Sequence, residues 1–225
     1  MICIVQARMS SKRLPGKILK KINKMPSIKI LVNSLNRSKL FKKVIVATSD
    51  QDIDKRLIKF CKKNNLNLFL GSLNNVCERL FNCALNHQEK YFVRISGDSP
   101  FMDVKIIKKL LLLKNRKKNY DIYTNVFPRT FPKGQSIEII KTDLIKKVKS
   151  LRNFDKEHVT TYFYRNYKNF KIINLKNKID QSHFNLCIDK QKDLIYFRKI
   201  LKEINLNKYI NYNKILGLMS DNEKN

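Results

Sequence analysis

Basic side chains gather in the stretch QARMSSKRLPGK, which directly follows the first apolar run of the chain, residues 2–5. Arg8, Lys12, Arg13 and Lys17 lie close together there, and a Pro-Gly pair just before the last of them predicts a turn. Basic side chains and backbone N–H groups on a tight loop are typical of a polyphosphate site. The stretch contains neither a GxxxxGK(S/T) phosphate loop nor a GxGxxG dinucleotide motif. The chemistry it predicts is the binding of a polyphosphate.

A carboxylate follows another apolar run, residues 91–95, in the sequence RISGDSP. Gly97 before Asp98 lets the backbone approach a ligand closely. Either Asp98 or Asp103 could instead begin the next helix as its N-cap. We assign the cap to Asp103 and a ligand role to Asp98.

Asp189 comes directly after the apolar run 185–188, and Asp193 lies four residues further on. An N-cap role is an equally good interpretation of this pair. If both runs are neighbouring strands, Asp98 and Asp189 place two carboxylates at one edge of a sheet. Mg²⁺ is typically held by one or two carboxylates together with substrate phosphates, so this pair suits a magnesium site.

Apolar residues recur in an alternating strand and helix rhythm over residues 1–115. The rhythm predicts a parallel sheet with helices on both faces. In such sheets ligands bind beyond the C-terminal ends of the strands, where the polar groups described above fall. The predicted strands are residues 2–5, 44–47, 66–70 and 91–95, and the predicted helices lie around residues 28–35, 53–61, 76–84 and 104–113.

The rhythm loosens after about residue 120. We expect one domain over residues 1–225, with a regular first half up to residue 118 and an elaborated second half after it. The predicted strands of the second half are 121–125, 135–140, 170–175 and 185–188, and its predicted helices are 142–151, 156–166, one through Leu194, Phe197 and Leu201, and a short one at 212–219.

The charge of the chain has two interpretations. The formal net charge of +30 by itself suggests nucleic acid or another polyanion as partner. The excess is almost all lysine, spread along the chain with 25 asparagines, which is typical of a solvated surface shaped by nucleotide-composition bias. A polyanionic substrate is compatible with both.

The sequence also predicts where the protein resides. It contains no apolar stretch of membrane-spanning length and no signal-peptide pattern, so we expect no membrane association. The five cysteines form no CxxC pair and no metal-ligand spacing, which indicates reduced thiols in a cytoplasmic protein.

Short segments along nearly the whole chain carry a resemblance: QARMSSKRLPGK, VATSD, GS at 71–72, VRISGDSPFMD, FPKGQSIEI, EHVT and CIDKQKDL. In this order and spacing they resemble the spore coat polysaccharide F family of cytidylyltransferases, relatives of acylneuraminate (CMP-sialic acid) and CMP-KDO synthetases. The resemblance implies a nucleotide-diphospho-sugar transferase fold, a three-layer α/β/α arrangement with a mostly parallel central sheet. It is highly specific for the family and much less specific for the substrate.

The resemblance implies transfer of a cytidylyl group from CTP to a hydroxyl of the acceptor, with release of pyrophosphate. Arg8, Lys17 and Asp98 would be catalytic, and Asp98 with Asp189 would hold Mg²⁺. Lys12 is a weaker candidate. The residues expected around the nucleotide are Arg8, Arg13, Lys17, Gly71, Ser72, Arg79 and Arg94.

The resemblance also implies a small anionic, sugar-like acceptor, a nonulosonic or KDO-like sugar acid, for surface glycan biosynthesis. It implies a nucleotide-binding half at residues 1–118 and an acceptor-binding and dimerisation half at 119–225, with a homodimer formed through residues 120–170. Ser11, Ser99 and Ser136 depart from the family pattern, and the last bears on the identity of the acceptor. The residues expected on the acceptor side are Asn125, Glu138, Glu157 and His158.

Two other functions remain open. A nucleotide-sugar-dependent glycosyltransferase of the same fold would carry a D-x-D motif, for which Asp50 and Asp52 have the spacing, but it would lack the basic RLPGK loop. A nucleic-acid-binding protein would show clustered arginines with interleaved exposed aromatic residues. The aromatic residues here mostly occur at core spacing, so nucleic acid is the weaker alternative.

Overall fold

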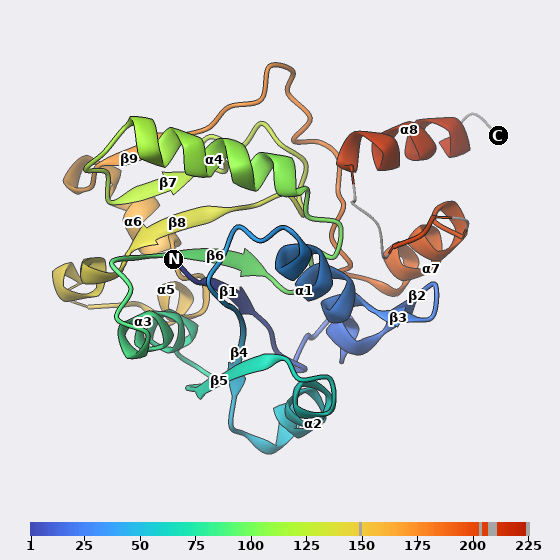
Figure 1. Cartoon of the computed structure of the whole chain (residues 1–225), viewed down its shortest axis with the longest axis horizontal. Coiled ribbons are helices and arrows are strands. Elements are labelled where there is room, and N and C mark those ends of the chain that lie inside the picture. The colour runs from blue at the N-terminus through green and yellow to red at the C-terminus, as the bar shows by residue number, and fades with distance from the viewer. Residues whose placement is uncertain (149, 203, 207–210, 224–225) are drawn as a thin grey trace.

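The computed structural model describes residues 1–148, 150–202, 204–206 and 211–223. A seven-stranded sheet in the order β5-β4-β1-β6-β8-β7-β9 runs through the centre of the molecule (Figure 1). Its strands are β1 (Cys3–Gln6), β4 (Val44–Ser49), β5 (Asn67–Gly71), β6 (Tyr91–Ser96), β7 (Ile122–Thr124), β8 (Glu138–Lys141) and β9 (Ile172–Asn174). A separate hairpin consists of β2 (Lys21–Ile22) and β3 (Met25–Pro26).

The predicted parallel strands of the first half are confirmed. β5, β4, β1 and β6 run parallel to one another, so their C-terminal ends meet at one edge. β8 is antiparallel to both β6 and β7, and β9 is parallel to β7. The strands after residue 118 therefore extend the same sheet, which is mixed but mostly parallel.

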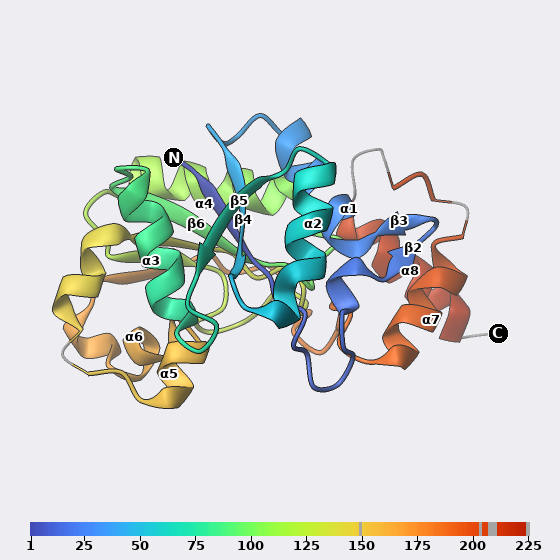
Figure 2. The ribbon, with the colours of Figure 1, turned by 90° about the horizontal axis from the view of Figure 1, so that it is seen from below.

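The side chains of each strand alternate between two apolar cores, one on each face of the sheet. Val5 and Val46 face one core, whereas Ile4 and Ile45 face the other. α3 (Val76–Asn86) and α6 (Thr161–Arg165) cover the second core, and α5 (Asn153–Glu157) packs against α3. The first core is covered by α1 (Ser27–Arg37), α2 (Lys55–Lys63), α4 (Val104–Arg116), α7 (Gln191–Ile200) and α8 (Tyr212–Glu223). These two helical layers complete the three-layer arrangement (Figure 2).

Two predicted helices of the second half are wrong in extent. Residues 142–147 form a 3₁₀ helix, η3 (Thr142–Lys147), and extended backbone follows at Val148, while residue 149 of the predicted helix lies outside the described residues. The predicted helix 156–166 is divided into α5 and α6. The Thr161 hydroxyl bonds the carbonyl of His158 and the carboxylate of Asp155, and such local side-chain bonds compete with a continuous helix.

The predicted strand 185–188 does not form. The N–H of Leu186 donates to the carbonyl of Lys133 at 2.8 Å, whereas the N–H of Ile188 donates to the carbonyl of Asp98 at 3.1 Å. Because these hydrogen bonds go to two different segments, the only β-pairing of the segment is an isolated bridge between Lys133 and Asn185 among the described residues. The segment nevertheless brings Asp189 to the end of β6.

No helix in the part of the chain that the structure describes combines the length and the apolar character that crossing a membrane requires.

Gly134 allows this approach of segment 185–188, so Gly134→Ala tests how Asp189 is placed. Gly134 has φ +91°, and an added Cβ would lie 2.8 Å from the backbone of Leu186. We expect the free energy of unfolding, measured by urea denaturation, to fall by about 1–3 kcal/mol.

Gly217→Ala in α8 is the matched control, because no atom outside its own helix lies within 4 Å of a Cβ added at Gly217. It should raise the free energy of unfolding by about 0.5–1 kcal/mol through helix propensity. Equal effects of the two substitutions would contradict the argument from close approach.

Candidate active site

A cavity of about 640 Å³ opens at the C-terminal ends of β1 and β6. Its walls come from the loop after β1, from the turn after β5 and from the end of α5. Eight of the predicted site residues line it: Arg8, Arg13, Lys17, Arg94, Asp98, Glu157, His158 and Asp189. Lys12 lines it as well. The cavity thus gathers side chains from distant parts of the chain at the edge where the parallel strands end.

The basic loop after β1 is held in shape by a turn and by a buried carboxylate. Gly16 has φ +67°, and its N–H donates to the carbonyl of Met9 at 3.0 Å. The N–H of Met9 donates to Asp54 Oδ1 at 2.6 Å, while Asp54 Oδ2 accepts from the backbone and hydroxyl of Ser49. Asp54 therefore ties the loop to the end of β4. The sequence analysis missed Asp54, because its bond to Met9 joins residues 45 positions apart in the chain.

Lys17 lies between two carboxylates. Its Nζ is 2.6 Å from Asp98 Oδ2 and 2.7 Å from Asp189 Oδ1. Burial acts to lower the pKa of Lys17, but the two carboxylates outweigh it and raise that pKa. Burial likewise acts to raise the pKa of Asp98, and Lys17 outweighs it and lowers that pKa. Arg13 Nη2 reaches the other oxygen of Asp189 at 3.1 Å.

The carboxylate oxygens around Lys17 Nζ are of the kind that bind a magnesium ion. Asp98 and Asp189 present oxygens within 3 Å of one point, and Mg²⁺ takes one or two carboxylates along with phosphate oxygens. Asp193 serves a different purpose, because its carboxylate accepts from the N–H groups of Asp189 and Lys190 at the start of α7. Within the described ranges no group of three or more His, Cys, Asp or Glu side chains converges, so substrate oxygens would complete the coordination.

Arg8 pairs with Glu157 at the end of α5. The hydrogen bond from Arg8 holds the pKa of Glu157 below its ordinary value of 4.5, against the opposing effect of burial. The ring of His158 packs against Phe154 with centroids 4.3 Å apart. The end of α5 therefore brings an acid and an imidazole to the cavity wall.

Arg94 is held by a buried network on the floor of the cavity. Its Nε and Nη2 donate to Gln6 Oε1 at 3.1 and 2.9 Å, and its Nη1 lies 2.5 Å from Glu138 Oε2. The hydroxyl of Tyr164 donates to the other oxygen of Glu138 at 2.5 Å. Burial and the adjacent Glu138 raise the pKa of Tyr164 well above its ordinary value. Glu138 is 2% exposed, so it contacts Arg94 from behind and does not line the cavity.

Four further predicted residues lie outside the lining. Arg79 is buried, and its Nη1 donates to the carbonyl of Ser72 at 2.6 Å, beneath the turn that borders the cavity. Burial lowers the pKa of Arg79 to about 10, while Asp54 acts to raise it. Gly71 packs directly on the Arg79 side chain. Asn125 joins two loop segments, because its amide donates to the carbonyl of Gln135 and accepts from the N–H of Ile137.

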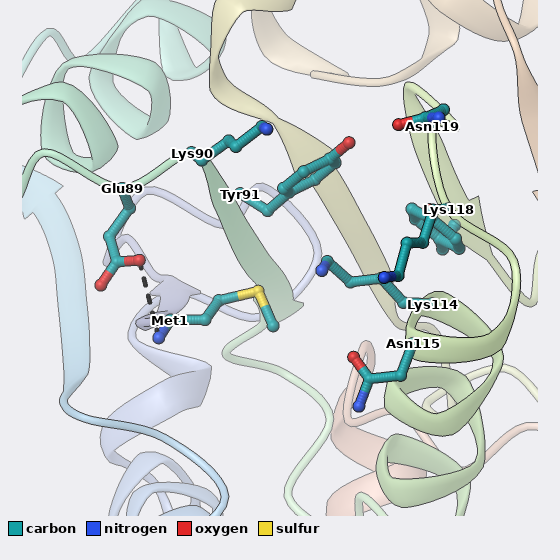
Figure 3. Close-up of a pocket in the computed structure, with 9 residues that line it drawn as sticks. Met1, Glu89, Lys90, Tyr91, Lys114, Asn115, Lys118 and Asn119 are labelled. Atoms are coloured by element: carbon teal, nitrogen blue, oxygen red, sulfur yellow. Dashed lines mark ion pairs between the residues drawn. The ribbon is translucent and has the colours of Figure 1, made fainter.

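A second hollow, of about 590 Å³, lies at the start of β6 and the end of α4, which is the opposite edge of the sheet (Figure 3). Its acid, Glu89, is paired with the amino terminus and with Lys42. Lys114 lies 4.6 Å above the ring of Tyr91, and burial together with the nearby Lys90 lowers its pKa. Cations at the end of α4 are favoured by the helix dipole, and the carboxylate pair is missing from this lining. The chemistry therefore belongs to the first cavity.

Comparison with known proteins agrees with this geometry. Residues 2–217 match the model of a protein family described as cytidylyltransferase. The chain belongs to the cytidylyltransferase family, and the protein is a nucleotidyltransferase with the corresponding fold.

Individual relatives support the assignment. The chain is 32% identical to an uncharacterized protein of Methanocaldococcus jannaschii, covering 91% of this chain and 84% of that one. It is 24% identical to the spore coat polysaccharide biosynthesis protein SpsF of Bacillus subtilis, covering 97% and 93%. A solved cytidylyltransferase from Leptospira borgpetersenii has a TM-score of 0.91 at 28% identity, covering 99% and 95%. The solved CMP:2-keto-3-deoxy-manno-octonic acid synthetase complexed with CTP shares the fold, with a TM-score of 0.67 at 15% identity over 90% and 98%.

Glu138→Gln should destabilise the protein more than Tyr164→Phe. The first change leaves the largely buried Arg94 cation without its carboxylate, which costs about 3–5 kcal/mol. The second removes the two hydrogen bonds of the Tyr164 hydroxyl, to Glu138 and to Thr124, each worth about 1 kcal/mol. Urea denaturation of both variants measures the difference, and equal losses would show that the ion pair is not the dominant contact.

The acid limb of stability should depend on Asp155, a buried carboxylate that accepts from Arg165 Nη2 at 2.6 Å and from Thr161. The Arg165 hydrogen bond holds the pKa of Asp155 below its ordinary value of 3.8, against burial. The contribution is therefore present above pH 3.8 and is lost as the pH falls through the lower folded-state pKa. Asp155→Asn should lower the free energy of unfolding at pH 7 and flatten its decline in acid. Parallel pH profiles of wild type and variant would contradict this assignment.

Proposed function

We propose that this cytidylyltransferase transfers CMP from CTP to a hydroxyl of a sugar acid, with Mg²⁺ and with release of pyrophosphate. The observation that supports the proposal most strongly is the convergence of Lys17, Asp98 and Asp189 in a cavity that also holds Arg8 and Arg13. This arrangement supplies the two things that a nucleotide triphosphate needs, cations for its phosphates and a carboxylate pair for its metal.

The basic loop would bind the triphosphate. Lys17, Arg8 and Arg13 present ammonium and guanidinium groups to the same cavity, and guanidinium forks bind phosphate oxygens in pairs. Their present partners are carboxylates, so phosphate oxygens would take over hydrogen bonds that are already aimed into the cavity. Arg94, fixed by Gln6 and Glu138, lies on the floor beside them.

Asp98 and Asp189 would hold Mg²⁺, which when bound neutralises charge on the phosphate oxygens. Lys17 contacts both carboxylates and Arg13 contacts Asp189, so these cations hold the pair in place.

In the proposed reaction the acceptor oxygen forms a bond to the α-phosphorus while the bond from that phosphorus to the leaving pyrophosphate breaks. The acceptor hydroxyl proton passes to solvent or to a carboxylate of the site. Such a displacement depends mostly on positioning and charge stabilisation. Arg8 and Lys17 would stabilise the charge that builds on the departing pyrophosphate.

The sugar acid is proposed from the names of relatives, since one fold neighbour is a synthetase for CMP:2-keto-3-deoxy-manno-octonic acid. SpsF, by its name, acts in polysaccharide biosynthesis, and we extend that role to this chain. Glu157 and His158 line the same cavity, and we assign them to the acceptor. The alternative glycosyltransferase gains no support from Asp50 and Asp52, because both are exposed and neither lines the cavity.

Pyrophosphate release tests the proposal. Each of the four nucleoside triphosphates is combined with Mg²⁺ and a panel of keto-sugar acids, and Asp98→Asn is compared with wild type. We expect release with CTP and a sugar acid, and a loss of about 100-fold or more in kcat for the variant.

Asp52→Asn removes an exposed carboxylate that pairs only with Lys55 among the described residues, so it should retain wild-type turnover. Release with UTP, ATP or GTP in preference to CTP would overturn the nucleotide assignment. Unchanged turnover in Asp98→Asn would overturn the role of the carboxylate pair.

A further inference from the structure

Few arginines of this chain are shielded from solvent, and two of them line the cavity. Four of the arginines in the described ranges are not exposed: Arg8, Arg79, Arg94 and Arg129. Arg8 and Arg94 line the cavity, and each pairs with a carboxylate. Arg129 differs from them, because its Nη1 donates at 3.0 Å to a neutral group, the hydroxyl of Ser136. No carboxylate in the described part of the chain forms an ion pair with Arg129.

The turn that carries Arg129 packs against the network around Arg94. Arg129 closes this turn with Val126, and Phe127 of the turn stacks on Tyr164 with centroids 4.8 Å apart and an interplanar angle of 10°. Tyr164 in turn bonds Glu138, the partner of Arg94. The turn is therefore anchored on the face of the sheet that carries the Arg94 network.

The strand register gives a second, independent placement. Arg94 of β6 lies opposite Glu138 of β8 in an antiparallel pair. Because β8 is antiparallel to β6, its first residue lies near the end of β6, where Ser96 lines the cavity. Ser136 precedes Glu138 by two residues, so alternation places its side chain on the same face. Ser136 and the guanidinium that it holds therefore lie near the strand end at which the cavity opens.

The charge of Arg129 is uncompensated by a partner of opposite sign, whereas the neighbouring cations of the cavity are matched. A half-buried guanidinium held at one nitrogen by a hydroxyl keeps its remaining N–H donors for another acceptor. A carboxylate suits this fork, because it accepts two parallel N–H bonds.

We propose that Arg129 binds the carboxylate of the acceptor sugar acid and that Ser136 positions its guanidinium. The inference rests on the proposed function, since it names the residue that recognises the acid group of that substrate. Arg129 thereby distinguishes a sugar acid from a neutral sugar of the same shape.

The test compares an acid with its neutral counterpart. Binding of 3-deoxy-manno-octulosonate and of N-acetylneuraminate is measured by calorimetry, and so is binding of their methyl esters. Arg129→Gln should weaken binding of the acid that wild type prefers by about 10- to 100-fold, the range for a hydrogen bond to a charged group. The same variant should leave the affinity for the ester and for CTP unchanged.

Ser136→Asp is a second variant that leaves the arginine in place. The new carboxylate would pair with Arg129 and compete with the substrate, so affinity for the acid should fall in the same direction. Arg129→Lys keeps the charge but loses the fork, and it should fall between wild type and Arg129→Gln. Arg116→Gln, an exposed arginine at the end of α4, makes the same change of charge and should bind the acid as wild type does.

The outcomes separate this inference from the proposed function. If wild type and Arg129→Gln prefer the acid over the ester equally, the role of Arg129 is overturned. It is also overturned if Ser136→Asp binds the acid with wild-type affinity. Absence of acid binding by wild type would overturn it as well. Failure of wild type to bind CTP would overturn the proposed function, while the acid and ester measurements would still report on Arg129.

Discussion

The contact of Lys17 with Asp98 and Asp189 is the constraint on which the rest of the site depends. It joins the loop after β1, the end of β6 and a segment from the last quarter of the chain at a single ammonium group. Each partner is partly buried, and breaking such a contact leaves an uncompensated charge in a place with little water. The sheet supplies two of the three groups through its parallel strands, and the third arrives along a segment that is bonded to Lys133 and to Asp98 itself. The shape of the cavity is therefore fixed only when all three segments are in place.

Much of the fold follows from local pattern. The apolar runs 2–5 and 44–47 could be recognised because a strand buried on both faces is apolar throughout. The runs 66–70 and 91–95 remained visible although Asn67 and Arg94 interrupt them. The second half resisted the same reasoning. A helical apolar pattern covers residues 156–166, yet Thr161 bonds backward to His158 and divides it. Segment 185–188 is apolar like a strand, but its hydrogen bonds depend on where Gly134 and Asp98 lie, which no local window can show.

The candidate site divides in a similar way. Cationic and acidic residues at strand ends could be found from sequence because their position relative to an apolar run is visible. Asp54, Tyr164 and Gln6 could not, because their roles lie in contacts with segments far away in the chain. Glu138 was expected to face the acceptor, and the structure instead buries it against Arg94. A carboxylate at the start of a strand looks the same in the sequence whether its side chain points into a cavity or packs behind the cavity wall.

The ion pairs between cations and carboxylates inside the cavity affect which ligands can bind there. Arg8, Arg13 and Lys17 each already contact a carboxylate, so an incoming anion competes with these acids and does not simply enter a positive well. A lone phosphate gains little binding free energy, because each hydrogen bond that it makes to a cation leaves a carboxylate without its partner. A ligand that carries phosphate oxygens together with a cation satisfies both sides of each pair at once. On a chain with a formal net charge of +30, this interior pairing favours a ligand that brings both charges over a simple anion.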